Sequence, residues 1–419
     1  MRSLFVIAAV ALVGCQTYDF EPVQPLAIGQ TTQSKNVVAH QLKPNLMMLL
    51  DKSGSMQTNT STQAPCPATI GGCGPGNTCP AGCNTRISDM QNAMDNLLTN
   101  AGKTARYGVA AFPQSAANSC SPTGPGDVMV QLLGPALSDD DTQLQAQADA
   151  VNTAIKMIIP GGGTPTADSL RFVGGLNELQ DTDRQNFVLL LTDGVPNCNA
   201  NNPNSCTSMT SSLCQCTTGT CTQMSGLCSL GCLDADASVD AVKELASKNI
   251  RTIVIGFGAD TAQATAFNTL NQMALAGQFA RTCPNAVDAD CGPGDHCNVD
   301  TINPKSSKCN QAFFQAANQA DLKAALDQIS AAIGGNSICQ YTLDQTPSDP
   351  RYLSVTVDGQ SLQRCPDGTD PMNPMGCNTW VYDNAGVPTV TFVGATCDKV
   401  KGATQQNPVS VQFRIVTKL

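Results

Sequence analysis

Five polar side chains with the chemistry of hard-cation ligands follow apolar segments of this sequence. They are two carboxylates and three hydroxyls, namely Asp51, Ser53, Ser55, Thr164 and Asp193. The first three form an Asp-x-Ser-x-Ser run directly after the apolar segment 45–50, and Asp193 follows the apolar segment 187–191. Oxygen ligands of this kind suit Mg²⁺ or Mn²⁺ in octahedral geometry. The sequence therefore predicts a divalent metal site, provided the fold brings the three segments together.

Alternation of strand and helix patterns supplies the required placement. Continuous apolar runs at 45–50, 107–112, 187–191 and 252–257 are typical of strands buried on both faces. Amphipathic segments between them predict helices, such as the stripe of Ile87, Met90, Met94, Leu97 and Leu98. We expect an α/β fold with a doubly wound, mostly parallel sheet. The carboxyl ends of parallel strands share one edge, where such folds bind ligands, so the five side chains should meet there.

Acidic residues also precede the helix expected to end near Met157. Ser138 and Asp141 predict a capping box, and the run Asp139, Asp140 and Asp141 is expected to complement the helix dipole rather than to bind metal. A final amphipathic helix, with Leu322, Leu326 and Ile333 on one face, should close the α/β unit near residue 335.

In order and residue type, Asp51-x-Ser53-x-Ser55, Gly162-Gly163-Thr164 and Thr192-Asp193-Gly194 resemble the metal-ion-dependent adhesion site (MIDAS) of von Willebrand factor A (vWA) domains. The resemblance covers about residues 44–335. It implies that Ser53, Ser55 and Thr164 bind the ion directly and that Asp51 and Asp193 act largely through water. It also implies an open coordination position for a partner's carboxylate. Mg²⁺ is the expected ion, with Mn²⁺ or Ca²⁺ as alternatives. The competing interpretation is either a purely stabilising ion with a complete coordination shell or a site that no longer binds metal.

The cysteines indicate an exported, disulfide-stabilised protein. Of 21 cysteines, Cys15 is set apart below, and the other 20 can pair. Zinc ligation is the alternative, but no Cys-x-x-Cys pair occurs. Three cysteine-rich inserts are expected at 57–84, 196–235 and 283–309, and either of the first two could form or cover the binding face. In the third, Asp288, Asp290 and Asp295 raise the alternative of calcium, although their spacing fits no EF-hand loop.

The amino-terminal segment predicts a lipid anchor. Residues 1–14 combine Arg2 with a short apolar run and read as a signal peptide, and the tetrapeptide 12–15 resembles a bacterial lipobox, which implies lipidation of Cys15. Gln16 follows Cys15 at the position where an aspartate tends to retain lipoproteins in the inner membrane, so the resemblance implies the outer membrane. We expect residues 15–43, rich in polar residues and proline, to form a tether.

The carboxyl-terminal residues 336–419 change pattern to short strands separated by proline, glycine and aspartate. They predict a small β-rich module with disulfides, in which Trp380 fills the core.

Composition excludes several functions. A net charge of −10 argues against nucleic acid as a partner. With only two histidines, His40 and His296, and no Gly-x-Ser-x-Gly or His-Glu-x-x-His sequence, we expect no enzyme activity.

Together these features resemble the surface lipoproteins that myxobacteria use in gliding motility. The leading hypothesis is an outer-membrane adhesin, anchored by lipid at the cell surface, that binds a carboxylate of a protein or surface ligand through the metal. The alternative is a periplasm-facing vWA scaffold for an envelope motility or secretion complex. In either case, outer-membrane or periplasmic motility proteins are the expected partners.

Overall fold

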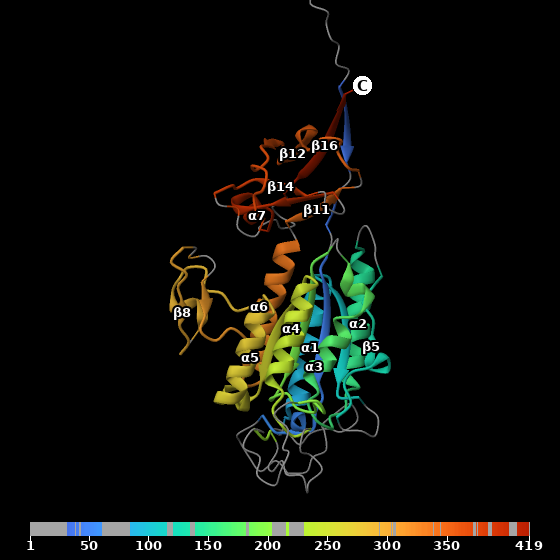
Figure 1. Ribbon diagram of the computed structural model, residues 1–419. Coiled ribbons are helices and arrows are strands. Elements are labelled where there is room, and N and C mark those ends of the chain that lie inside the picture. Colours follow the sequence, from blue (N-terminus) through green and yellow to red (C-terminus); the bar gives the residue numbers. More distant parts are fainter. Residues whose placement is uncertain are drawn as a thin grey trace, which may run out of the picture.

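The computed structural model shows an α/β body with a β-rich module at one end (Figure 1). It describes the residues in the following ranges: 32–37, 39–41, 43–60, 84–114, 120–134, 139–181, 184–202, 215–217, 230–292, 294–302, 304, 307–337, 339–343, 345–371, 374, 376–383, 388–401 and 409–418. The predicted signal peptide, Cys15, most of the insert at 57–84 and much of the insert at 196–235 lie outside these residues.

The α/β body is built on a six-stranded sheet in the order β10-β7-β6-β3-β4-β5. Its strands are β3 (Asn45–Asp51), β4 (Arg106–Phe112), β5 (Val128–Val130), β6 (Asn186–Thr192), β7 (Ile250–Phe257) and β10 (Phe314–Ala316). All neighbouring pairs are parallel except β4 with β5. In chain order this is the 3-2-1-4-5-6 arrangement of a doubly wound sheet, here with an antiparallel edge strand. The predicted fold class, an α/β fold with a doubly wound, mostly parallel sheet, is confirmed.

Helices cover both faces of this sheet. They are α1 (Arg86–Ala101), α2 (Asp141–Lys156), α3 (Thr166–Val173), α4 (Ala235–Ser247), α5 (Ala264–Ala276) and α6 (Gln319–Ser337). Along β3, Leu46, Met48 and Leu50 belong to the core shared with α1, α2 and α6, whereas Met47 and Leu49 belong to the core shared with α3, α4 and α5. Because both faces are covered, the strand reads as an unbroken apolar run.

The aspartate run before α2 is used differently from our expectation. Asp140 is the N-cap and accepts a hydrogen bond from the Gln143 backbone N–H (2.9 Å), whereas Ser138 lies outside the described residues. Asp139 does not serve the helix dipole. Its buried carboxylate pairs with Arg106 (2.8 Å) and Arg184 (2.6 Å), both also buried. Asp139 therefore links the starts of β4 and β6, because two buried guanidinium groups need a buried anion.

The β-rich module at the top of Figure 1 contains two four-stranded antiparallel sheets, in the orders β1-β16-β12-β13 and β14-β15-β11-β2. Its elements are β1 (Thr32–Val37), β2 (Ala39–Gln41), β11 (Gln340–Leu343), β12 (Leu353–Val357), β13 (Gln360–Leu362), β14 (Trp380–Asp383), β15 (Thr389–Phe392), α7 (Gly394–Lys401) and β16 (Val411–Lys418). Trp380 is buried in its core, as predicted. Disulfides Cys339–Cys397 and Cys365–Cys377 reinforce it.

Strands β1 and β2 correct the prediction of a tether over 15–43, because residues 32–37 and 39–41 are part of this module. They pair antiparallel with β16 and β11, respectively. The segment 32–36 is polar and has no hydrophobic alternation that would predict a strand. Strand pairing itself is made by backbone groups, which every sequence has.

The third insert is a small disulfide knot beside α5 (Figure 1), with the short strands β8 (Cys297–Asn298) and β9 (Lys308–Cys309). Cys283–Cys297 and Cys291–Cys309 close it. Disulfides are thus confirmed. Among the helices of the described residues, none is long and apolar enough to cross a membrane.

Candidate functional site

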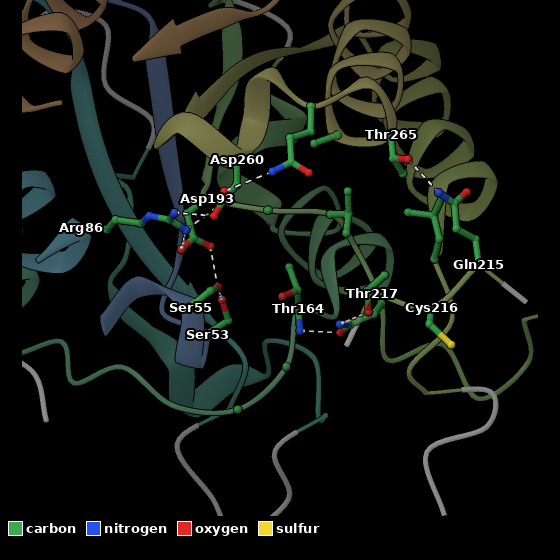
Figure 2. A pocket seen from close by; sticks show the side chains of 18 residues that line it. Ser53, Ser55, Arg86, Thr164, Asp193, Gln215, Cys216, Thr217, Asp260 and Thr265 are labelled. Carbon is green, nitrogen blue, oxygen red and sulfur yellow. Dashed lines mark hydrogen bonds and ion pairs between the residues drawn. The ribbon is translucent and has the colours of Figure 1, made fainter. Parts of the chain in front are cut away.

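The carboxyl ends of the parallel strands point downwards in Figure 1. The three predicted loops meet there around a pocket of about 430 Å³. Four of the five predicted residues line it: Ser53, Ser55, Thr164 and Asp193. In Figure 2 the Thr164 side chain faces Ser53 and Ser55 across the pocket. Asp51 is fully buried and is bonded to the pocket residue Ser53. The fold therefore brings all five residues together.

Two turns are joined to each other by backbone hydrogen bonds. β3 ends at Asp51, and a short 3₁₀ helix, Gly54–Gln57, begins after Ser53. Gly54 donates to the Gly162 carbonyl (2.9 Å), and Gly161 donates to the Lys52 carbonyl (2.6 Å). Gly162 has φ +93°, a conformation that favours glycine. Backbone hydrogen bonds therefore hold the Thr164 loop against the Ser53 turn, and Gln57 Nε2 adds a side-chain bond to the Pro160 carbonyl (3.0 Å).

The polar side chains form a connected set of hydrogen bonds. Ser53 N–H and the Thr192 hydroxyl each donate to one carboxylate oxygen of Asp51 (both 2.7 Å). The Ser53 and Ser55 hydroxyl oxygens are 2.9 Å apart, and Ser55 donates to Asp193 (2.7 Å). Because the Ser55 hydroxyl donates its hydrogen bond to Asp193, the lone pairs of its oxygen remain available for a cation.

Asn197 is a residue of this site that the sequence analysis missed. Its Oδ1 accepts from Thr164 N–H (2.8 Å), its own N–H donates to the Thr164 carbonyl (2.9 Å), and its Nδ2 donates to Thr217 (2.9 Å). The disulfide Cys120–Cys198 packs against the same loop, since the Cys198 sulfur leaves no room for a Cβ at Gly163. The second insert thus holds Thr164 in place from its cysteine-rich side.

Arg86 is the other missed residue. It is the first residue of α1 and is 5% exposed. Its guanidinium donates to Asp193 Oδ2 (2.9 Å) and to Asp260 Oδ2 (2.6 Å), as Figure 2 shows. A lone arginine after an insert carries no spacing that would have indicated this role.

The two carboxylates are buried close enough to disfavour each other's ionisation. Burial, followed by the charge of Asp193, raises the pKa of Asp51 to about 7. Burial also raises the pKa of Asp193, while Arg86 opposes that rise. Two buried, mutually repelling carboxylates with hydroxyls beside them need positive charge. The residues present therefore fit a divalent cation bound by oxygen.

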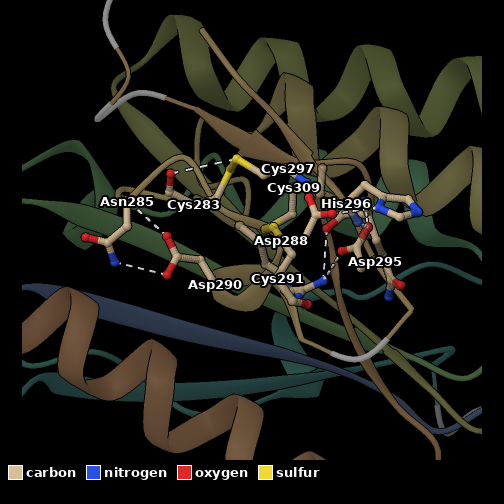
Figure 3. The surroundings of a disulfide bond; sticks show 12 residues. Cys283, Asn285, Asp288, Asp290, Cys291, Asp295, His296, Cys297 and Cys309 are labelled. Carbon is tan, nitrogen blue, oxygen red and sulfur yellow. Dashed lines mark hydrogen bonds and ion pairs between the residues drawn. A yellow bond between two sulfur atoms is a disulfide. The ribbon is translucent and has the colours of Figure 1, made fainter.

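The alternative calcium set in the third insert does not converge (Figure 3). Asp288 accepts from Cys297 N–H and contacts His296, Asp290 accepts from Asn285, and Asp295 pairs with Arg281. The sulfurs of Cys283, Cys291 and Cys309 lie together, but all three are in disulfides and offer no thiolate.

No protein-family model and no curated protein sequence matches the chain. Among solved structures, the pilus adhesin SpaC from Lactobacillus rhamnosus GG, in an open conformation, has a TM-score of 0.41 at 15% identity, over 91% of this chain and 40% of that one. The vWF domain of the type V pili tip protein Mfa5 from Porphyromonas gingivalis has a TM-score of 0.35 at 12% identity, over 70% of this chain and 95% of that one. Proximal thread matrix protein 1 from the mussel byssus, with a zinc-occupied MIDAS motif, has a TM-score of 0.34 at 13% identity, over 72% and 50%. This chain spans well under half the length of SpaC.

Proposed function

We propose that the chain is a metal-dependent adhesin whose site captures a carboxylate of a protein or surface ligand. The observation that carries the proposal is the convergence of three hydroxyls and two buried carboxylates at one edge of the sheet, open to a pocket. A bound Mg²⁺, or another divalent ion, would supply a Lewis-acidic contact for the ligand's carboxylate. Ser53, Ser55 and Thr164 would hold it through their hydroxyl oxygens. Asp51 and Asp193 would act largely through water.

Hydroxyl ligands matter for this function because they are neutral. A cation held by neutral oxygens keeps more of its charge than one held directly by carboxylates, so it attracts an anionic ligand more strongly. Asp51 and Asp193 each use both carboxylate oxygens in hydrogen bonds to protein groups, which orients them and moderates their negative charge.

The arrangement of the molecule supports presentation of this site to the outside. Strand β1 lies in the module at one end of the molecule, and the pocket lies at the opposite end (Figure 1). Lipid on Cys15, 17 residues before the start of β1 at Thr32, would place the pocket at the end remote from the membrane. We therefore propose an outer-membrane lipoprotein at the cell surface.

The motility assignment rests on resemblance. The combination of lipobox, vWA-like body and about twenty cysteines resembles the myxobacterial gliding-motility adhesin lipoprotein CglB, and we propose a comparable coupling of envelope to substratum. We propose no catalysis for this site, since neither histidine lines the pocket. Outer-membrane or periplasmic motility proteins are proposed as further partners.

Attachment of cells that carry Thr164→Val tests the proposal. The substitution keeps the shape of the side chain and removes only one hydroxyl ligand, so attachment should fall to the level seen with a chelator. Thr265→Val is the matched control, because Thr265 lines the same pocket but bonds Gln215 outside the cluster. Undiminished attachment of the Thr164→Val cells would contradict the proposal.

Protease treatment of intact cells tests on which side of the outer membrane the chain lies. A surface protein is digested, whereas a periplasm-facing scaffold survives until the cells are broken. Survival of the chain in intact cells would contradict the surface adhesin and favour the periplasm-facing scaffold.

A further inference from the structure

Arg86 places a fixed positive charge against a carboxylate of the proposed metal site. Its side chain is 6% exposed and the Asp193 side chain is fully buried, and 2.9 Å separates their charged atoms. Asp193 thus shares its two oxygens between a cationic partner, Arg86, and a neutral one, Ser55. A cation at this position competes with metal for the same carboxylate.

The backbone of Gly258, after β7, fixes the guanidinium in place. Gly258 has φ +95°, and a Cβ there would lie 2.7 Å from Arg86 Nε. The other end of the guanidinium is held by Asp260 Oδ2 at 2.6 Å. Arg86 therefore cannot swing away from Asp193 without leaving a buried pair unmade, which is costly.

Arg86 changes the net charge of the site once a divalent ion is bound. Asp51 and Asp193 alone would neutralise a divalent ion completely. With Arg86 included, the buried protein groups contribute one net negative charge, so the loaded site keeps one positive charge. The Asp260 side chain is 57% exposed, so water screens its charge more than those of the buried groups.

We infer that Arg86 is a specificity-determining residue that weakens metal binding and leaves the loaded site one charge short. The missing charge equals that of a single carboxylate, the group that the proposed function already assigns to the ligand. This inference rests on the proposed function and adds to it the residue that sets the charge of the loaded site.

The full chain carrying Arg86→Met tests the inference. Methionine has a similar apolar stem and no charge. Mn²⁺ is the probe, since electron paramagnetic resonance counts free Mn²⁺ and water-proton relaxation reports the water that acetate displaces from bound Mn²⁺. Removing a like charge this close should tighten Mn²⁺ binding at least about tenfold and weaken acetate binding by about fivefold or more. Arg86→Lys keeps the charge and should stay within about threefold of wild type for Mn²⁺.

Asp260→Asn shifts the same balance in the opposite direction and leaves Arg86 present. It should weaken Mn²⁺ by about threefold and tighten acetate, because a screened negative charge is lost. This variant decides the matter if Arg86→Met fails to fold. Mn²⁺ affinity that is unchanged in Arg86→Met, or unchanged or tighter in Asp260→Asn, overturns the role of Arg86. Absence of Mn²⁺ binding in the wild-type chain instead overturns the proposed function itself.

Discussion

Replacing Asp51 by asparagine should stabilise the metal-free chain and abolish its response to metal. The reason is that Asp51 is fully buried and its pKa is raised to about 7, chiefly by burial and then by Asp193. Above pH 7 the folded chain must hold an ionised carboxylate that the unfolded chain ionises at no cost. The native state is therefore destabilised by this group at high pH, and removing the charge relieves that.

The magnitude follows from linkage. A pKa raised from 3.8 to about 7 corresponds to at most about 4 kcal/mol of unfolding free energy. The penalty is absent below pH 4, grows as the pH rises towards 7, and is complete above it. Asparagine loses one acceptor for Ser53 N–H or the Thr192 hydroxyl, which costs about 1–2 kcal/mol. The net gain in EDTA at pH 8 should be about 2–3 kcal/mol.

Urea unfolding of the disulfide-intact chain, at pH 5 and pH 8, with EDTA or with Mg²⁺, measures these differences. Wild type should gain about 2.7 kcal/mol when Mg²⁺ is at one hundred times its dissociation constant, and Asp51→Asn should gain nothing. The EDTA advantage of the variant should shrink at pH 5. Asp236→Asn, an exposed acid, should change stability by less than about 0.5 kcal/mol. A variant less stable than wild type in EDTA at pH 8, or one that Mg²⁺ stabilises as much as wild type, would refute the reasoning.

Three further predictions concern other parts of the chain. Asn197→Ala removes the side-chain acceptor for Thr164 N–H, so Mg²⁺ affinity measured by calorimetry should fall about tenfold. The free energy of unfolding should fall by only about 1–2 kcal/mol. Equal Mg²⁺ affinities of variant and wild type would show that Thr164 is held in place without Asn197. Asp139→Asn removes the anion that pairs with both Arg106 and Arg184, although Arg184 keeps its pair with Asp181 (3.3 Å), and should cost about 3–5 kcal/mol in urea unfolding. Mg²⁺ affinity should be unchanged, because Asp139 lies at the far end of the sheet; a loss below 1 kcal/mol would disprove its structural role. Replacing both Cys339 and Cys397 by serine opens a link across 58 residues and should cost about 4 kcal/mol in the β-rich module. The Mg²⁺ response of the α/β body should survive that change, and its loss would contradict the separation of site and module.

Much of the fold was predictable because the apolar runs record burial directly. β3, β6 and β7 lie between two helical layers, so their central residues are apolar whichever face of the sheet they take. The shared edge follows from right-handed crossovers between parallel strands, whereas the order of the strands was not predicted. The positions of the five polar residues could therefore be inferred before any coordinates.

The parts that could not be predicted depend on contacts between distant segments with no periodic pattern. Arg86 meets Asp193 over 107 residues of sequence, and Asn197 meets Thr164 over 33. Strands β1 and β2 pair through backbone hydrogen bonds with β16 and β11, which lie at the other end of the chain. Asp139 looked like a helix-dipole residue because its two arginine partners are invisible in the local sequence.

Anomalous diffraction from a crystal of the full chain soaked in Mn²⁺ tests the central claim most directly. We expect one strong Mn²⁺ peak in the pocket within bonding distance of the Ser53, Ser55 and Thr164 hydroxyls. Well-ordered loops with no peak between them, or a peak bound elsewhere in the chain, would contradict the claim that these residues form a metal-dependent adhesion site.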